Sequence, residues 1–155
     1  MRTPFRLLVA AVSSASLSAA SAPLAAQPAP AKSLYERIGG QPALKAVVDD
    51  FVATAAPDPK VDFTRGGVWV ASDAAVAGLK KHLVDFMAQA LGGPKAYTGR
   101  SMKAAHSGMG ITQAQFDALA GHLKAALVKN KVAAADVAEI MKVAASTAPD
   151  IIEKR

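Results

Sequence analysis

His82 is one of three histidines in this sequence, and its neighbours make it a candidate ligand. It follows Leu79 by three residues and precedes Phe86 by four, which places its imidazole on the apolar face of a predicted helix. A polar ring on that face needs a partner, because an unpaired buried polar group costs free energy. A hydrogen-bonded core histidine is the simpler interpretation of His82 taken alone, and a ligand to a metal is the alternative.

His106 is the second candidate, at the end of a short predicted helical segment. Met102 stands four residues before it, on the same side of the helix. Gly108 and Gly110 follow, and glycines permit the close approach of a flat ligand or of another backbone. A hydrogen-bonded core residue is again the simpler interpretation of His106 alone, but two histidines that face one apolar interior strengthen the case for a shared ligand.

The remaining composition restricts what that ligand can be. The sequence has no cysteine, which excludes disulfides, thiolate-bound zinc, iron–sulfur clusters and covalently attached c-type heme. Zinc prefers three or four ligands, and Asp85, three residues after His82, is expected to point away from the apolar face. No H-E-x-x-H, P-loop or Ser-His-Asp pattern is present. A large apolar cofactor with one central metal fits better, and heme iron takes one or two axial imidazoles in an apolar slot.

The elements that must position these histidines are predicted to be helices. Hydrophobic residues make up 52% of the 155-residue chain and charged residues 19%, so the chain is not disordered. Alanine is the commonest residue, while aromatic residues make up only 5%, which favours an all-α fold. The capping boxes Ser33-x-x-Glu36 and Thr112-x-x-Gln115 predict two helix starts.

Apolar periodicity and the Gly and Pro positions predict four long helices and two short ones. The first short helix stops at Gly39-Gly40, Pro42 is placed at the first position of the next helix, and Pro57 and Pro59 end that helix. Residues 60–72 and 95–111 are predicted to be irregular, apart from a short helical piece at 101–106. The other long helices are expected at about 73–91, 112–128 and 133–148, the last of them followed by Pro149.

The N-terminus is predicted to be a targeting segment rather than part of the fold. Arg2 and Arg6 precede a short apolar run, and small residues around Ala25-Ala26 suggest a cleavage point. We therefore expect a cleaved signal peptide at 1–26, a linker at 27–32, a globular domain at 33–155 and a periplasmic location. A retained membrane anchor is the alternative, although the run is too short to cross a bilayer.

The charge pattern indicates whether nucleic acid is an expected partner. The formal net charge is +6, but no run of basic residues exceeds two and no aromatic residues alternate with them, so nucleic acid is not an expected partner. No stable membrane insertion is expected once the signal peptide is removed.

An ordered set of motifs resembles the group 1 truncated hemoglobins over residues 33–152. The motifs, in order, are Ser33-Leu34-Tyr35-Glu36-Arg37-Ile38-Gly39-Gly40, Val47-Val48-Asp49-Asp50-Phe51, Leu91-Gly92-Gly93-Pro94, Tyr97-Thr98-Gly99-Arg100, Met102-x-x-x-His106 and Gly110-Ile111-Thr112. The resemblance implies a truncated globin fold, a two-over-two helical sandwich with a short irregular proximal segment, that holds non-covalent heme b.

The resemblance also implies roles for single residues. His106 matches the proximal iron ligand, and Phe63 matches an aromatic residue that packs on the heme. The expected apolar lining of the slot is Phe51, Leu79, Leu83, Phe86 and Met102. Tyr97, Arg100 and Lys103 are candidates to meet the heme propionates, because carboxylates favour cationic and hydroxyl donors. His122 is expected to be solvated or locally bonded, and Trp69 has no assigned role.

The sequence departs from the family on the distal side of the heme. Many members place Tyr and Gln there to hydrogen-bond dioxygen, whereas the matching residues here are Val52 and Leu83, which donate no hydrogen bond from their side chains. His82 matches a position at which some members supply a second axial histidine. The distal side is therefore predicted to be apolar except for this one potential ligand.

The function implied is reversible binding of O2, CO or NO at the heme iron by a protein that is more simply a carrier than an enzyme. The alternative is a bis-histidyl protein for electron transfer or nitric oxide chemistry, with a redox partner. A heme-free interaction module on the same fold is a third class. The absence of the distal Tyr and Gln argues against tight oxygen storage.

Overall fold

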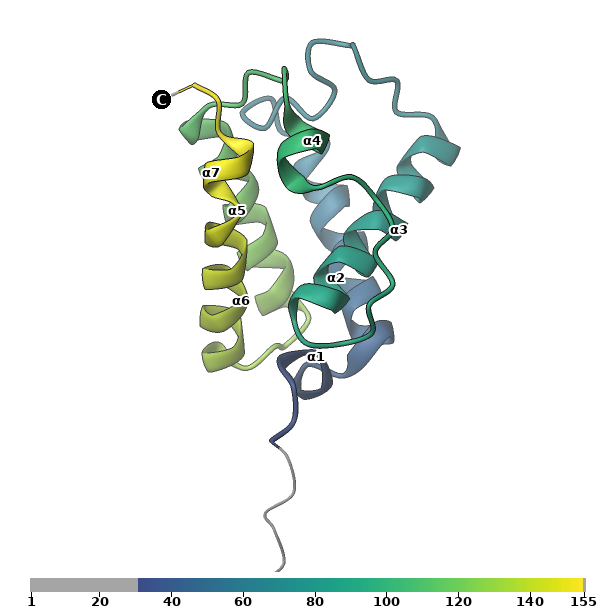
Figure 1. Cartoon of the computed structure of the whole chain (residues 1–155), viewed down its shortest axis with the longest axis vertical. Helices are drawn as coiled ribbons and strands as arrows, with labels where there is room; N and C mark the ends of the chain where they lie inside the picture. The colour runs from purple at the N-terminus through teal and green to yellow at the C-terminus, as the bar shows by residue number, and fades with distance from the viewer. Residues whose placement is uncertain (1–30, 155) are drawn as a thin grey trace, which may run out of the picture. The chain divides into compact units, whose positions relative to one another are not determined.

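A computed structural model of the chain describes residues 31–154, and within them the fold is all-α (Figure 1). The predicted signal peptide at 1–26 and most of the predicted linker lie outside the described residues. The helices are α1 (Leu34–Arg37), α2 (Gly40–Ala55), α3 (Asp73–Ala90), α4 (Met102–His106), α5 (Gln113–Lys129), α6 (Ala134–Ser146) and α7 (Ala148–Ile151). Residues 60–72 contain turns but no helix, as predicted.

Side-chain caps determine where four of these helices begin. The hydroxyls of Ser33, Ser72, Ser101 and Thr112 each accept a hydrogen bond from a backbone N–H in the first turn of α1, α3, α4 and α5. Such bonds satisfy donors that have no partner within the helix. Both predicted capping boxes are present, since Glu36 and Gln115 return the bond to the cap residue.

Two predicted boundaries were wrong, both near prolines. Helix α2 begins at Gly40, so Pro42 is its third residue and not its first. Pro149 does not simply follow the last helix but lies in the first turn of α7. Both differences have the same cause: proline lacks an N–H, and the N–H groups of the first helical turn need no partner within the helix.

The long helices form two pairs laid one over the other. Helix α2 packs against α3 and against α5, while α5 also packs against α6, and α4 and α7 lie together at one end (Figure 1). Leu44, Val47 and Val48 of α2 meet Leu127 of α5 and Ile140 of α6 in the centre, each with no more than 1% of its surface exposed. The predicted two-over-two sandwich is therefore confirmed.

Ion pairs join the helices around this core. The Arg37 guanidinium binds Asp136 (Nε–Oδ1, 2.8 Å) and Glu139 (Nη2–Oε2, 2.5 Å), which ties α1 to α6. Asp50 binds the Lys129 ammonium (2.6 Å), which ties α2 to the end of α5. The hydrogen bond from Lys129 and, to a smaller extent, the one from Asn130 stabilise the charged form of Asp50 and so lower its pKa.

The described residues contain one short β-type contact, in which Thr112 pairs with Lys154, but no strand. None of the helices in residues 31–154 has the length and the apolar character needed to cross a membrane.

Candidate functional site

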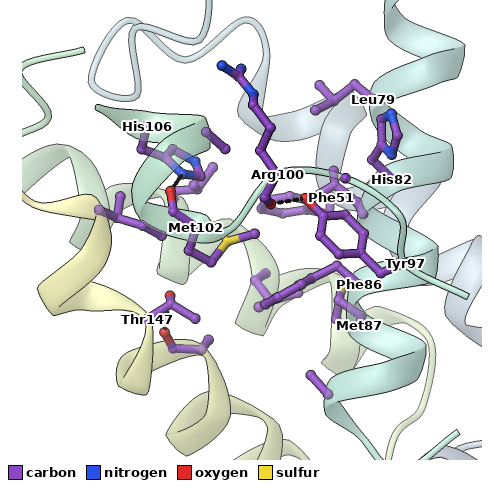
Figure 2. Close-up of a pocket in the computed structure, with 18 of the residues that line it drawn as sticks. Phe51, Leu79, His82, Phe86, Met87, Tyr97, Arg100, Met102, His106 and Thr147 are labelled. Carbon is purple, nitrogen blue, oxygen red and sulfur yellow. Dashed lines mark hydrogen bonds between the residues drawn. The ribbon is translucent and has the colours of Figure 1, made fainter. Parts of the chain in front are cut away.

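A cavity of about 640 Å³ opens between α3 and the elements α4 to α7 (Figure 2). This volume lies within the range of about 300–1,000 Å³ that is typical of cofactor and small-molecule sites. Phe51 of α2 contributes to the wall, as do Phe116, Leu119 and Leu123 of α5 and Ile140 of α6. Most of the lining is apolar, so polar groups that project into the cavity stand out.

Helix α3 has two apolar faces, and they have different roles. The predicted stripe of Leu79, Leu83 and Phe86 lines the cavity. The face buried in the protein core is instead formed by Val84 and Asp85 (each 8% exposed) with Ala88. Asp85 lies away from the stripe, as predicted, but its burial was not predicted. The Lys81 ammonium lies 2.5 Å from the Asp85 carboxylate and offsets the cost of burying this charge.

His106 reaches the cavity from the last position of α4. Its Nδ1 atom lies 2.8 Å from the carbonyl oxygen of Met102. A carbonyl can only accept a hydrogen bond, so Nδ1 carries the proton and the neutral ring has its lone pair on Nε2. This arrangement fixes the ring and gives it the electronic form that binds a metal. Met102 and His106 both border the cavity, in agreement with their predicted place on one side of the helix, and the hydrogen bond to the Met102 backbone is an addition that the sequence analysis did not predict.

His82 lines the same cavity from α3, on the opposite side from His106 (Figure 2). The prediction of a buried ring was wrong, because the residue is exposed. The ring meets Tyr97 edge-to-face, with centroids 6.1 Å apart, and makes no hydrogen bond with any residue in 31–154. The argument that metal binding relieves a burial cost therefore does not apply, although the imidazole nitrogens remain available.

Tyr97 and Arg100 also line the cavity, but only one of them offers a free donor. The Tyr97 hydroxyl donates to the backbone carbonyl of Arg100 (2.7 Å), and the Tyr97 ring packs against Phe86 with centroids 5.5 Å apart. A Cβ at position 99 would overlap the Tyr97 ring, so Gly99 permits this arrangement. The exposed Arg100 guanidinium has no ion-pair partner in residues 31–154 and is suited to an anion. Lys103 does not line the cavity.

Phe63 and Val52 occupy a different place from the one predicted. Both line a second cavity of about 250 Å³ between α2, α3 and the loop at 60–72, and neither borders the main cavity. Trp69, which had no assigned role, borders both cavities and meets Phe63 edge-to-face at 6.0 Å. Of the two positions expected on the distal side, only Leu83 therefore borders the main cavity.

The third histidine is not part of the site. His122 Nε2 lies 2.8 Å from Asp58 Oδ2, and His122 does not border either cavity. This hydrogen bond is the main reason why the pKa of Asp58 is lower than that of a free carboxyl. The prediction of a solvated or locally bonded side chain was wrong in this respect, because the partner lies 64 positions away in the sequence and the pair is partly buried.

Several residues of the site were not predicted. The far wall includes Met109, Val143, Thr147 and Ile151. Thr147 brings no free donor, since its hydroxyl bonds the Ala144 carbonyl at 2.7 Å. Only the apolar periodicity of the helix predicted at about 133–148 could have indicated this wall, and such periodicity is equally typical of a helix that packs in the core.

Comparisons with known proteins agree with this geometry. The family model for bacterial-like globins matches residues 33–153. The group 1 truncated hemoglobin GlbN of Mycolicibacterium paratuberculosis is 40% identical over 119 residues, which cover 77% of this chain and 83% of that protein. The truncated hemoglobin of Tetrahymena pyriformis in its Fe(III) form is 32% identical and superposes with a TM-score of 0.71, covering 79% of this chain and 100% of that one.

The helical pairs and the histidine at the end of α4 define a globin of the two-over-two type. The chain belongs to the group 1 truncated hemoglobins. Its cofactor is accordingly non-covalent heme b.

The residues present fit that cofactor. Heme is a flat, largely apolar ring with a central iron and anionic propionates, so it needs an apolar slot, an imidazole and cationic donors at the rim. The cavity supplies apolar walls, the Nε2 atom of His106 and the free guanidinium of Arg100. No group of three His, Asp or Glu side chains in residues 31–154 is placed to bind a bare metal ion.

Proposed function

We propose that this globin binds diatomic gases reversibly at a heme iron held by His106. The observation that carries the proposal is the orientation of His106, whose Nδ1 is bonded to the Met102 carbonyl while its ring borders the large apolar cavity. Heme b, when bound, would supply an iron that accepts one small ligand in addition to the His106 nitrogen.

The protein's own residues would control access and orientation. Phe51, Leu79, Leu83, Phe86 and Met102 exclude water from the slot, because their side chains offer no strong hydrogen-bonding group. Arg100 would bind a propionate, and Tyr97 would position Arg100 through its bond to the backbone carbonyl. These are binding and positioning roles, as expected for a carrier of small ligands.

The wall opposite His106 supports only a weak preference for dioxygen over CO and NO. Leu83 cannot donate a hydrogen bond, and the Tyr97 hydroxyl already donates to Arg100. Bound dioxygen is more polar than bound CO, so a wall on which these two residues offer no donor, with His82 as the remaining candidate, favours CO and NO relative to the donor-rich pockets of other members. Tight oxygen storage is therefore not part of the proposed function.

A second candidate function is bis-histidyl coordination, with electron transfer or nitric oxide chemistry as its consequence. One observation favours it: His82 borders the same cavity as His106, from the opposite wall (Figure 2). Because the His82 ring makes no hydrogen bond with any residue in 31–154, it would bind iron without first losing one. A redox partner would be required for this function.

The proposal includes export to the periplasm. It is supported by the basic start at Arg2 and Arg6, the short apolar run and the small residues at Ala25-Ala26. N-terminal sequencing of the protein from its native compartment tests this, and a mature chain in the cytoplasm that begins at Met1 would contradict it.

Absorption spectra of the ferric, ferrous and CO-bound protein test the gas-binding function. We expect a Soret band that shifts when CO is added to the reduced protein and that returns when CO is removed. A chain that purifies without heme and does not take it up would exclude both candidate functions and leave the interaction module.

A further inference from the structure

The carboxylate of Glu153 is bonded to the loop that follows the candidate iron ligand. Its Oε1 atom accepts a hydrogen bond from the backbone N–H of Gly108, and its Oε2 atom accepts one from Gly110, both at 2.6 Å. These two glycines stand two and four residues after His106, whereas Glu153 lies just beyond α7. A single side chain thus bridges two segments that are remote in sequence.

The backbone of this loop is shaped to present its N–H groups to one carboxylate. Gly108 and Gly110 have φ values of +81° and +61°, a region that residues with a side chain rarely adopt. The adjacent backbone is also joined, because the N–H groups of Glu153 and Lys154 both donate to the carbonyl of Ile111, at 2.9 and 3.1 Å. The loop from His106 to α5 is therefore held to the C-terminal segment by four hydrogen bonds.

Helix α4 needs such support because it is very short. Its five residues are too few for a helix that is stable by itself. Ser101 caps the N-terminal end, but His106 is the last residue at the other end and is followed directly by the glycine loop. Any movement of the loop would therefore move the His106 backbone and turn its imidazole.

We infer that Glu153 is a positioning residue for His106, acting by holding Gly108 and Gly110 in place. The inference rests on the proposed function, in which His106 binds the heme iron. An exposed carboxylate that only fastened the C-terminus would stabilise the fold, but it would not alter the bond between His106 and iron.

Three variants of the full chain, loaded with heme, test the inference. Glu153→Gln keeps the size of the side chain but replaces one carboxylate oxygen by an NH2 group, which only donates, so one glycine N–H loses its acceptor. Glu153→Asp keeps the charge but shortens the side chain. The control is Asp150→Asn, which also removes one negative charge, at an exposed residue of α7 whose side chain makes no hydrogen bond within residues 31–154.

Two measurements are made: the rate of heme transfer to an excess of heme-free acceptor globin, and the iron–histidine stretching band of the ferrous protein in resonance Raman spectra. We expect Glu153→Gln to lose heme at least threefold faster than the wild type and to shift or broaden the band. Glu153→Asp should lie in between, and Asp150→Asn should match the wild type in both measurements.

The inference is overturned if Glu153→Gln matches Asp150→Asn in both measurements, or if it lowers only the melting temperature of the heme-free protein while the band stays unchanged. If the wild type binds heme and the His106→Ala variant still shows the same iron–histidine band, the proposed function names the wrong iron ligand. Failure of the inference and failure of the proposed function can thus be told apart.

Discussion

The Nδ1 atom of His106 donates a hydrogen bond to the carbonyl oxygen of Met102, one helical turn earlier, over 2.8 Å. This bond sets the tautomer of the ring, because the acceptor has no proton to give. It also restricts rotation of the imidazole within a helix of only five residues. The ligand geometry of this globin therefore depends on the integrity of a very short helix.

Replacing His82 separates the two candidate functions. We expect the ferric wild type to contain a low-spin fraction due to His82, and His82→Leu to be high-spin and to bind CO faster, because no internal ligand must first leave. The apparent CO affinity should rise by the reciprocal of the open fraction. His122→Leu is the control, since His122 borders neither cavity. A wild type that is already high-spin at neutral pH, with no change in His82→Leu, leaves the simple gas carrier.

The apolar distal wall can be tested by adding a donor. Leu83 borders the main cavity, so Leu83→Gln should place an amide N–H near a bound gas. A net hydrogen bond of about 0.5–1.5 kcal/mol would slow O2 dissociation by about two- to tenfold, with a smaller effect on CO. Stopped-flow displacement of O2 by CO measures this rate, and Leu83→Met is the apolar control. Equal effects of the two substitutions on O2 would show that position 83 does not face the ligand.

The free guanidinium of Arg100 should contribute to heme retention. Because Arg100 is exposed, its pairing with a propionate is worth about 0.2–1 kcal/mol, and Arg100→Gln should raise the rate of heme loss by a factor between about 1.4 and 5. The effect should shrink at high salt, as expected for an exposed ion pair. Lys95→Gln removes a nearby exposed charge outside the cavity lining and should leave the rate unchanged. Identical rates for both variants would remove Arg100 from the site.

Low pH should weaken the ion pair between Asp50 of α2 and Lys129 of α5. Lys129 and Asn130 lower the pKa of Asp50 in the folded protein, so this carboxylate stabilises the fold fully above its unfolded pKa of about 3.9. That contribution is lost as the pH falls from about 4 through the folded pKa. Asp50→Asn should therefore be less stable than the wild type at pH 7, with the difference shrinking at pH 3.

Urea unfolding of the heme-free protein at the two pH values measures the acid effect. Asp150→Asn, which breaks no described contact, serves as the control. A difference between Asp50→Asn and the wild type that is the same at pH 7 and pH 3 would contradict the assigned role of the Asp50 carboxylate.

The helix starts were predictable because their signals are local. Ser33 with Glu36, and Thr112 with Gln115, lie within one turn of each other, so the sequence alone shows both partners of each capping box. The stripe on α3 was equally visible. However, periodicity cannot tell an apolar face that lines a cavity from one that packs in the core, and the core face of α3 includes the charged Asp85.

The parts of the site that were missed depend on contacts between remote segments. Phe63 was assigned to the slot from its place in the chain, but the turns of the 60–72 loop direct Trp69 to the main cavity and Phe63 to the second one. Glu153 is separated from Gly108 by 45 positions, and no local pattern marks an exposed glutamate as the acceptor for two loop amides. Such pairs become visible only when the fold brings them together.

The identity of the proximal ligand is tested most directly by the absorption spectra of His106→Ala beside those of His122→Ala. We expect the wild type and His122→Ala to show the same ferrous and CO-bound spectra of a histidine-ligated heme. His106→Ala should lose that signature and should release heme faster, because only apolar contacts and the propionate pairing would remain. A His106→Ala protein that keeps heme with an unchanged proximal-histidine spectrum would contradict the central assignment.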